Sequence, residues 1–219
     1  MDKEFSQKLV HIPAGKVTLE GGLAIPEAAG AIVLFAHGSG SSRHSPRNKW
    51  VAQVLHGEGL ATLLLDLLSK DEDMLYETRF DIDLLTRRLN IATEWILRQR
   101  ETKSFAVGYF GASTGAAAAL EAAAALGRKV GAVVSRGGRP DLARSLGRVL
   151  APTLLIVGGR DDQVIELNQE AYNELKTEKQ LVIVPGATHL FEEPGALDEV
   201  ARLAADWFKR HLKQQPQQP

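Results

Sequence analysis

The chain has 219 residues, of which 44% are hydrophobic and 24% are charged, and its formal net charge is −1 at pH 7. These values are typical of a soluble globular protein with one sizeable core, and they give no electrostatic reason to expect nucleic acid or an anionic membrane as a partner. The sequence contains no cysteine, which excludes disulfides, thiolate metal sites and a cysteine nucleophile.

We do not expect the N-terminal stretch to be a signal peptide. The N-terminal stretch MDKEFSQKLVHIPAG is charged early and has no apolar core of the length that a signal peptide requires. No later apolar run approaches the length of a membrane span. We therefore expect a cytoplasmic protein in which residues 1–212 form one domain. The tail 213–219, KQQPQQP, has nothing to bury and is expected to be disordered.

The first predicted elements are strands. Residues 16–26 alternate apolar and polar side chains around Gly21 and Gly22, which predicts an antiparallel hairpin at one edge of a sheet. The uninterrupted apolar run 31–36 is typical of a strand covered on both faces. A long polar loop follows it and begins with HGSG at 37–40.

The rest of the chain alternates between strands and helices. Apolar runs bounded by turn residues predict strands over 61–65, 105–110, 130–135, 153–157 and 180–184. Apolar periodicity and one alanine-rich segment predict helices over 48–58, 79–100, 116–126, 141–146, 164–175 and 195–212. Because parallel strands need crossover connections, this order predicts an α/β fold: a mostly parallel central sheet with an N-terminal antiparallel hairpin and helices on both faces.

A candidate nucleophile lies between a predicted strand and a predicted helix. Residues 111–115 read Gly-Ala-Ser-Thr-Gly. In a strand-turn-helix context the pattern G-x-S-x-G places the serine hydroxyl at the tip of a sharp turn, and its glycines let the strand and the helix pass close by. Ser113 is therefore a candidate nucleophile. The alternative is an ordinary strand-to-helix turn with an incidental serine.

Two later strands are followed by the residues that such a serine needs. Asp161 and Asp162 come after the strand 153–157, and His189 comes after the strand 180–184. A nucleophilic serine needs a base, and the base needs a carboxylate that orients it. The order Ser113, Asp161, His189 is the order found in α/β-hydrolases, and ligands of such sheets bind beyond the carboxyl ends of the strands. We therefore predict a catalytic triad.

Each member of this triad also has a structural interpretation. Asp161 is well placed to cap the helix that follows it, and Asp162 is the alternative carboxylate. His189 has the alternative of an ordinary surface-loop residue. His37 closes a buried strand, and we expect it to hold loop backbone and not to act as the base.

An acyl-transfer site also needs donors for the oxyanion. We expect one from the backbone N–H of Thr114, which follows the candidate nucleophile at a helix N-terminus. The other is expected from the loop after residue 36, with Ser39 preferred. Gly38 and Gly40 remain alternatives, because the sequence identifies this loop without its conformation.

From residue 31 to about residue 212 the chain resembles α/β-hydrolases, most of all the small dienelactone-hydrolase-like group. The matching motifs are HGSG at 37–40, GASTG at 111–115, GGRDDQV at 158–164 and GATHLF at 186–191. The family pattern G-x-x-D-x-x-V around the acid is met by Gly158, Asp161 and Val164. This resemblance implies ester-type hydrolysis. Dienelactone hydrolase itself uses a cysteine nucleophile, and this chain departs from it there.

The expected site is open. A lid is commonly inserted after the strand that here ends near residue 135, but the segment 136–152 is too short to form one. We therefore expect short acyl or lactone substrates. Several cations fall on loops at the same edge and are candidates for binding an anionic substrate, with a solvated charged rim as the alternative. These residues are Arg43, His44, Arg47, Arg136, Arg139 and Arg160.

The sequence thus predicts a serine hydrolase of small carboxylic esters or lactones. Ser113 would form an acyl-enzyme, His189 would act as general base and acid, and Asp161 would orient His189. The alternatives are acyl transfer or perhydrolysis at the same triad, and a non-catalytic ligand-binding protein of the same fold. We expect no metal, no cofactor, and no nucleic-acid or membrane partner.

Overall fold

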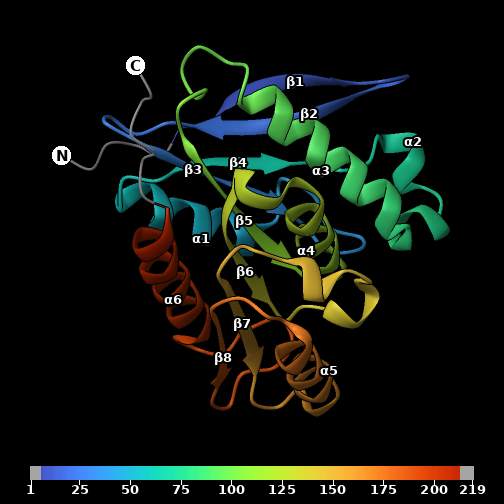
Figure 1. Cartoon of the computed structure of the whole chain (residues 1–219), viewed down its shortest axis with the longest axis vertical. Helices are drawn as coiled ribbons and strands as arrows, with labels where there is room; N and C mark the ends of the chain where they lie inside the picture. The colour runs from blue at the N-terminus through green and yellow to red at the C-terminus, as the bar shows by residue number, and fades with distance from the viewer. Residues whose placement is uncertain (1–5, 213–219) are drawn as a thin grey trace.

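The chain folds around one eight-stranded sheet, described here from a computed structural model that covers residues 6–212. The strand order is β1-β2-β4-β3-β5-β6-β7-β8 (Figure 1). Only β1 and β2 run antiparallel to their neighbours, and β4, β3 and β5 to β8 are parallel. The strands are β1 (Lys8–Ala14), β2 (Val17–Ala24), β3 (Ala31–Ala36), β4 (Ala61–Leu65), β5 (Ala106–Ala112), β6 (Val130–Arg136), β7 (Thr153–Gly158) and β8 (Lys179–Val184).

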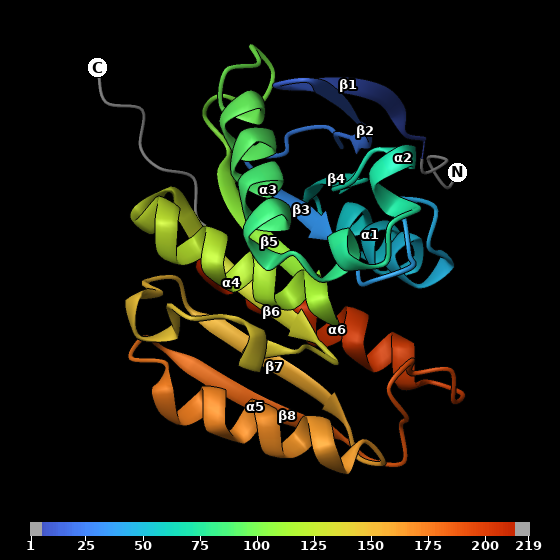
Figure 2. The ribbon, with the colours of Figure 1, turned by 90° about the vertical axis from the view of Figure 1, so that its right-hand side faces the viewer.

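Helices cover both faces of this sheet (Figure 2). One face packs against α3, α4 and α5, and the other packs against α1 and α6, so that two apolar layers enclose the strands. The α-helices are α1 (Pro46–Gly57), α2 (Lys70–Asp73), α3 (Ile82–Ile96), α4 (Thr114–Leu126), α5 (Asp162–Glu174) and α6 (Ala196–His211). The 3₁₀ turns are η1 (Glu77–Phe80), η2 (Gly127–Lys129), η3 (Pro140–Leu142) and η4 (Leu146–Arg148).

The predicted α/β fold is confirmed, including the two strands that the sequence delimits most sharply. β3 and β4 have the predicted bounds, and every residue of both is buried. Each is covered on both faces, which is why its sequence is an uninterrupted apolar run. The parallel strands place their carboxyl ends along one edge, where the loops after β3, β5, β6, β7 and β8 meet.

The N-terminal hairpin exists, but its turn was placed wrongly. β1 and β2 pair with Ala14 opposite Val17, so the chain reverses at Gly15, whose φ is 75°. Gly21 and Gly22 lie inside β2 and pair with β4. A Cβ atom at Gly21 would lie 2.8 Å from Leu63 Cδ1, so this glycine serves close packing and not chain reversal.

Two helix predictions also need correction. The helix expected over 79–100 begins only at Ile82, because the Asp81 side chain accepts the Leu84 N–H and caps it there, and it ends at Ile96. The helix expected over 141–146 is replaced by two 3₁₀ turns. In that segment the N–H groups of Arg144 and Ser145 donate to the Glu121 carboxylate, which satisfies them without helical bonds.

Some sequence predictions fall outside the described part of the chain. The tail 213–219, which we expected to be disordered, lies beyond it, as do residues 1–5. Between residues 6 and 212, no helix has both the length and the apolar character needed to cross a membrane.

Candidate active site

Ser113 occupies a strained turn between β5 and α4. Its φ of 51° and ψ of −123° lie in a region that residues with a side chain rarely adopt. Ser113 is the N-cap residue of α4, yet its side chain makes no capping hydrogen bond. The residue is only partly buried, so the hydroxyl is held at the surface end of the turn and is not used to start the helix.

Glycines make this turn sterically feasible. A Cβ atom at Gly111 would lie 2.5 Å from the Cα of Ala116, and one at Gly115 would lie 2.2 Å from the carbonyl oxygen of Ala36. Gly38 packs against the serine itself, because a Cβ there would be 2.9 Å from Ser113 Cβ. The G-x-S-x-G pattern therefore reflects backbone contacts between β5, α4 and the end of β3.

The backbone of Ser113 is anchored by the segment that follows β6. Its N–H donates to the carbonyl oxygen of Arg136 at 3.3 Å, and its own carbonyl oxygen accepts the Arg139 N–H at 3.1 Å. Neighbouring strands thus fix the strained conformation.

His189 and Asp161 form the hydrogen-bonded pair that the sequence predicted. Nδ1 of His189 lies 2.7 Å from Oδ2 of Asp161. Asp161 is the N-cap residue of α5 by position, but its side chain makes no capping bond, and it points to the imidazole instead. Asp162 is exposed and is the first residue of α5. The geometry therefore favours Asp161 over Asp162 and over a purely capping role.

The loop that carries His189 is pinned to the end of β7. A Cβ atom at Gly158 would lie 2.5 Å from the carbonyl oxygen of Ala187, and the Arg160 N–H donates to that same oxygen at 2.9 Å. Two residues after the histidine, Phe191 adopts a φ of 56° and is buried. The His189 side chain remains 39% exposed, so it is held in place and still reachable from solvent.

Ser113 and His189 flank the same peptide. A Cβ atom at Gly137 would lie 3.5 Å from both Cε1 and Nδ1 of His189, so the imidazole sits directly over this glycine. The preceding residue, Arg136, accepts the Ser113 N–H. Ser113 and the His189–Asp161 pair, which follow β5, β8 and β7, thus adjoin the same two residues, 136 and 137, at the carboxyl edge of the sheet.

The two residues predicted to supply the oxyanion donors are joined by a contact that the sequence did not reveal. The backbone N–H of Ser39 donates to the side-chain Oγ1 of Thr114 at 2.9 Å. Thr114 is the first residue of α4, where the backbone N–H has no acceptor within the helix. A hydroxyl residue directly after the candidate nucleophile was the available signal, but its partner is set by tertiary structure.

His37 has the structural role that we predicted. Its Nε2 accepts the backbone N–H of Leu67 at 3.3 Å, and its Nδ1 lies 3.0 Å from the carbonyl oxygen of Gly38. These two contacts tie the end of β3 to the loop after β4. This histidine is buried and is not available as a base.

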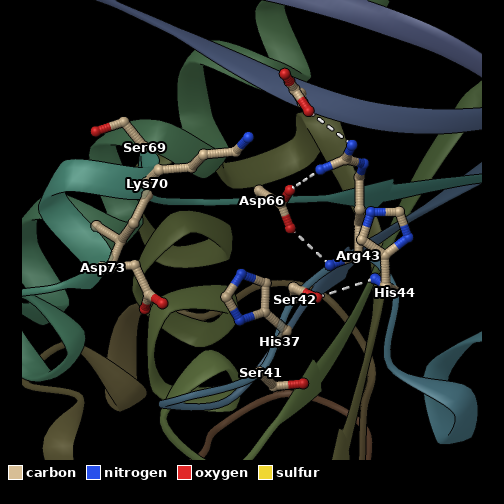
Figure 3. A pocket seen from close by; sticks show the side chains of 11 residues that line it. His37, Ser41, Ser42, Arg43, His44, Asp66, Ser69, Lys70 and Asp73 are labelled. Carbon is tan, nitrogen blue, oxygen red and sulfur yellow. Dashed lines mark hydrogen bonds and ion pairs between the residues drawn. The ribbon is translucent and has the colours of Figure 1, made fainter.

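A polar pocket of about 260 Å³ lies beside this histidine, over the ends of β3 and β4 (Figure 3). Arg43 crosses it between two carboxylates: its guanidinium lies 2.6 Å from Glu20 and also pairs with Asp66, which in addition accepts the Arg43 N–H. Arg43 is thus neutralised inside the protein. His44 lines the same pocket and is exposed.

Arg136 differs from the other cations that were predicted to lie around the site. Its side chain is buried, its Nε has no hydrogen-bond partner among residues 6–212, and no ion pair within that range includes it. The guanidinium lies 5.8 Å from the centre of the Phe191 ring. Burial, and then the neighbouring charge of Arg47, lower the pKa of Arg136 to about 10, which still leaves it charged at neutral pH.

The other rim cations do not converge on one site. Arg139 pairs with Asp141, and that bond raises the pKa of Arg139. Arg47 pairs with Glu192. Arg160 lines a groove of about 440 Å³ formed by the end of β8 and the loop that leads to α6. The proposed substrate-binding set Arg43, His44, Arg136 and Arg160 is therefore spread over three places, and Arg136 alone among these four is both buried and without a carboxylate partner.

The site has the groups for nucleophilic chemistry. Within residues 6–212, no group of three or more His, Asp or Glu side chains is placed to hold a metal ion. At this edge of the sheet lie the Ser113 hydroxyl, which makes no capping bond, and the imidazole of His189, which is oriented by Asp161. The N-terminus of α4 directly follows Ser113. Such a set can transfer a proton from the hydroxyl and stabilise negative charge beside it.

Known proteins match nearly the whole chain. The dienelactone hydrolase family matches residues 19–214. The crystal structure of a dienelactone hydrolase from Anabaena variabilis ATCC 29413 is 56% identical, covers 95% of this chain and 99% of that chain, and gives a TM-score of 0.93. A Xanthomonas campestris α/β serine hydrolase without a lid covers 96% of this chain and 97% of its own, with 21% identity and a TM-score of 0.76, a likeness that shows the fold alone.

Two curated relatives carry a different name. They come from two strains of Mycobacterium tuberculosis, are each called "Putative phosphoribosyl transferase", and are 58% identical to this chain over 212 residues. The match covers 96% of this chain but 48% of each relative. The chain therefore spans about half the length of these curated relatives.

Proposed function

Because the chain belongs to the dienelactone hydrolase family, we propose that it is a serine hydrolase that cleaves small carboxylic esters or lactones through an acyl-enzyme. The observations that support this most directly are the 2.7 Å bond between His189 and Asp161 and the strained turn at Ser113. A serine is activated when a carboxylate orients an imidazole that takes the proton of the serine hydroxyl.

In the first half of the proposed reaction, Ser113 Oγ attacks the ester carbonyl carbon. Nε2 of His189 takes the hydroxyl proton, and the imidazolium that forms is stabilised by Asp161 at Nδ1. The carbonyl oxygen becomes an oxyanion, which the Thr114 N–H and the Ser39 N–H stabilise. The proton path from Ser113 to His189 is part of this proposal.

In the second half, the tetrahedral intermediate collapses and breaks the bond to the leaving alcohol. His189 gives its proton to the leaving oxygen, and Ser113 keeps the acyl group as an ester. Water then attacks the acyl carbon, with His189 again taking a proton. The second tetrahedral intermediate then breaks its bond to Ser113 Oγ, which takes the proton back from His189, and the carboxylic acid leaves. A lactone follows the same steps, except that its leaving oxygen remains tethered to the acyl group.

The surroundings of the triad favour small substrates. The segment between β6 and β7 contains only short 3₁₀ turns, and His189 is 39% exposed, so no inserted domain covers the site from that segment. Arg136 supports an acid-bearing substrate, because a buried guanidinium without a carboxylate partner is costly unless an anion completes it. We propose Arg136, and not the neutralised Arg43, as the residue that attracts a negatively charged group.

The name of the mycobacterial relatives is not carried over. It belongs to proteins of about twice this length, whereas this chain itself matches the dienelactone hydrolase family over residues 19–214. A phosphoribosyl transfer activity for this chain has no supporting feature among its described residues.

A covalent probe tests the proposed function. A fluorophosphonate should label the wild-type protein at Ser113, as mapped by peptide mass spectrometry, and the wild type should hydrolyse p-nitrophenyl acetate. Ser113→Ala should lose both properties while keeping the wild-type circular dichroism spectrum. An unlabelled wild type, or label on another residue with full turnover by Ser113→Ala, would contradict the proposal.

A further inference from the structure

The side chain of Thr114 holds a hydrogen-bond donor that the proposed reaction needs. The Ser39 N–H, one of the two proposed oxyanion donors, donates to Thr114 Oγ1 at 2.9 Å. Thr114 supplies the other proposed donor through its own backbone N–H. Thr114 thus supplies one donor through its backbone N–H, and its hydroxyl oxygen accepts the hydrogen bond of the other donor, the Ser39 N–H.

The backbone around this contact is tightly packed. A Cβ atom at Gly115 would lie 2.2 Å from the carbonyl oxygen of Ala36 and 2.5 Å from that of His37, so the first turn of α4 rests directly on the end of β3. Gly38 fits against the Cβ of Ser113 in the same way. Moving the Ser39 amide away from Thr114 would disturb all of these contacts. Rotation of the Thr114 side chain is the smaller change, because threonine in helices populates two χ1 rotamers.

We propose that Thr114 is a positioning residue that closes the oxyanion hole in the resting protein, and that its hydroxyl must release the Ser39 N–H when the oxyanion forms. This inference rests on the proposed serine hydrolase function. No covalent bond changes at Thr114, which keeps its proton. The Ser39 N–H exchanges a neutral oxygen acceptor for an anionic one, and a bond to an anionic acceptor is the stronger of the two.

The exchange has a kinetic consequence. A hydrogen bond that exists before attack and is lost in the transition state raises the barrier, because only interactions stronger in the transition state accelerate a reaction. Replacing Thr114 with valine keeps the branched shape and removes the acceptor. The Ser39 N–H is then unpartnered at rest and is satisfied by the oxyanion, so the variant should be less stable and faster.

The test uses the full chain with two substitutions at this position. Thr114→Val should raise kcat for p-nitrophenyl acetate about three- to tenfold, which matches the net worth of one hydrogen bond, and should lower Tm by about 2–6 °C. Thr114→Ser keeps the acceptor, so its kcat should stay below that of Thr114→Val. A phenylboronic acid, which forms a tetrahedral adduct with a serine nucleophile, should bind Thr114→Val more tightly by a factor similar to the gain in kcat.

A second buried threonine provides the control for a loss of stability alone. Thr102 is fully buried and donates to the carbonyl oxygen of Ile96 at 2.7 Å, away from the triad. Thr102→Val should lower Tm and leave kcat unchanged. If Thr114→Val has a kcat at or below that of the wild type, the hydroxyl supports the loop and the proposed release of the Ser39 N–H is refuted. If the wild type itself neither turns over the ester nor reacts with a fluorophosphonate, the proposed function fails, and the proposed role of Thr114 fails with it.

Discussion

Asp161 reaches past the helix that it precedes and places Oδ2 2.7 Å from Nδ1 of His189. An aspartate at an N-cap position commonly accepts a backbone N–H of the first helical turn, and this one does not. The helix gives up a capping bond, and an imidazole in a partly exposed loop gains a fixed orientation. Such an exchange favours function over local stability, as expected where a site residue breaks a local rule.

The two adjacent aspartates should therefore differ sharply in effect. Asp161→Asn should lower kcat for p-nitrophenyl acetate by about 10²–10⁴-fold, because an amide in this position no longer stabilises the imidazolium and favours the wrong tautomer. Asp162→Asn should stay within about twofold of the wild type, since this side chain is exposed at the start of α5. Steady-state kinetics of both variants check this. A larger loss in Asp162→Asn than in Asp161→Asn would assign the carboxylate to Asp162.

We expect the buried charge of Arg136 to lower the free energy of unfolding and to favour binding of an acid-bearing substrate. Replacing it with methionine removes a buried charge that has no carboxylate partner, so Arg136→Met should raise the free energy of unfolding by about 1–3 kcal/mol. The same variant should lose preference for an acid-bearing ester over a neutral one, with kcat/KM for p-nitrophenyl hemisuccinate falling about tenfold or more relative to p-nitrophenyl acetate.

Arg43 is the matched control for that experiment. It is partly buried, whereas Arg136 is buried, and it is bracketed by Glu20 and Asp66, so Arg43→Met leaves two carboxylates without their partner. This variant should lose stability and keep the substrate preference. Urea unfolding and the ratio of the two kcat/KM values distinguish the arginines. Loss of the preference in Arg43→Met instead of Arg136→Met would move the anion site to the pocket of Figure 3.

Glycines that look alike in the sequence should respond in opposite ways to alanine. Gly115→Ala would place a Cβ atom 2.2 Å from the carbonyl oxygen of Ala36, a backbone atom that cannot move aside, so we expect a loss of about 3 kcal/mol or more and a misplaced Ser113. Gly57 is the last residue of α1, and a Cβ there meets nothing within 4 Å. Gly57→Ala should stabilise the protein by about 0.4–1 kcal/mol. Chemical denaturation of both variants checks the signs.

Alkaline conditions should destabilise the protein partly through Tyr109. This phenol is fully buried, its hydroxyl lies 2.6 Å from Thr93 Oγ1, and burial raises its pKa above the ordinary value of 10.0. A folded-state pKa above the unfolded one means that the stabilising contribution is complete below pH 10 and is lost as the pH rises, because only the unfolded chain ionises there. Tyr109→Phe should therefore be less stable at pH 7 but lose stability less steeply above pH 10. Equal slopes for the variant and the wild type in thermal unfolding against pH would contradict this.

The architecture could be read from local patterns because the strands are buried on both faces. β3 and β4 appear in the sequence as apolar runs between polar turns, and their bounds were predicted correctly. The hairpin turn was predicted at the wrong position because glycine occurs both in turns and where strands pack closely. Gly21 and Gly22 were interpreted as a turn, but they allow close packing inside β2, while the chain reverses at Gly15. The helix expected over 141–146 was wrong because Glu121, distant in the sequence, satisfies its N–H groups.

The sequence by itself determined the fold class, the strained serine turn and the chain order of three reactive groups, because these depend on local periodicity, glycine sterics and strand-end position. Only the tertiary structure decided which aspartate faces His189, that Thr114 holds the Ser39 N–H, and which arginine lacks a carboxylate. Each of these is a contact between residues far apart in the chain. A hydrogen bond or an ion pair depends on distances of a few ångströms that the folded arrangement of strands sets, and no local pattern of residues encodes them.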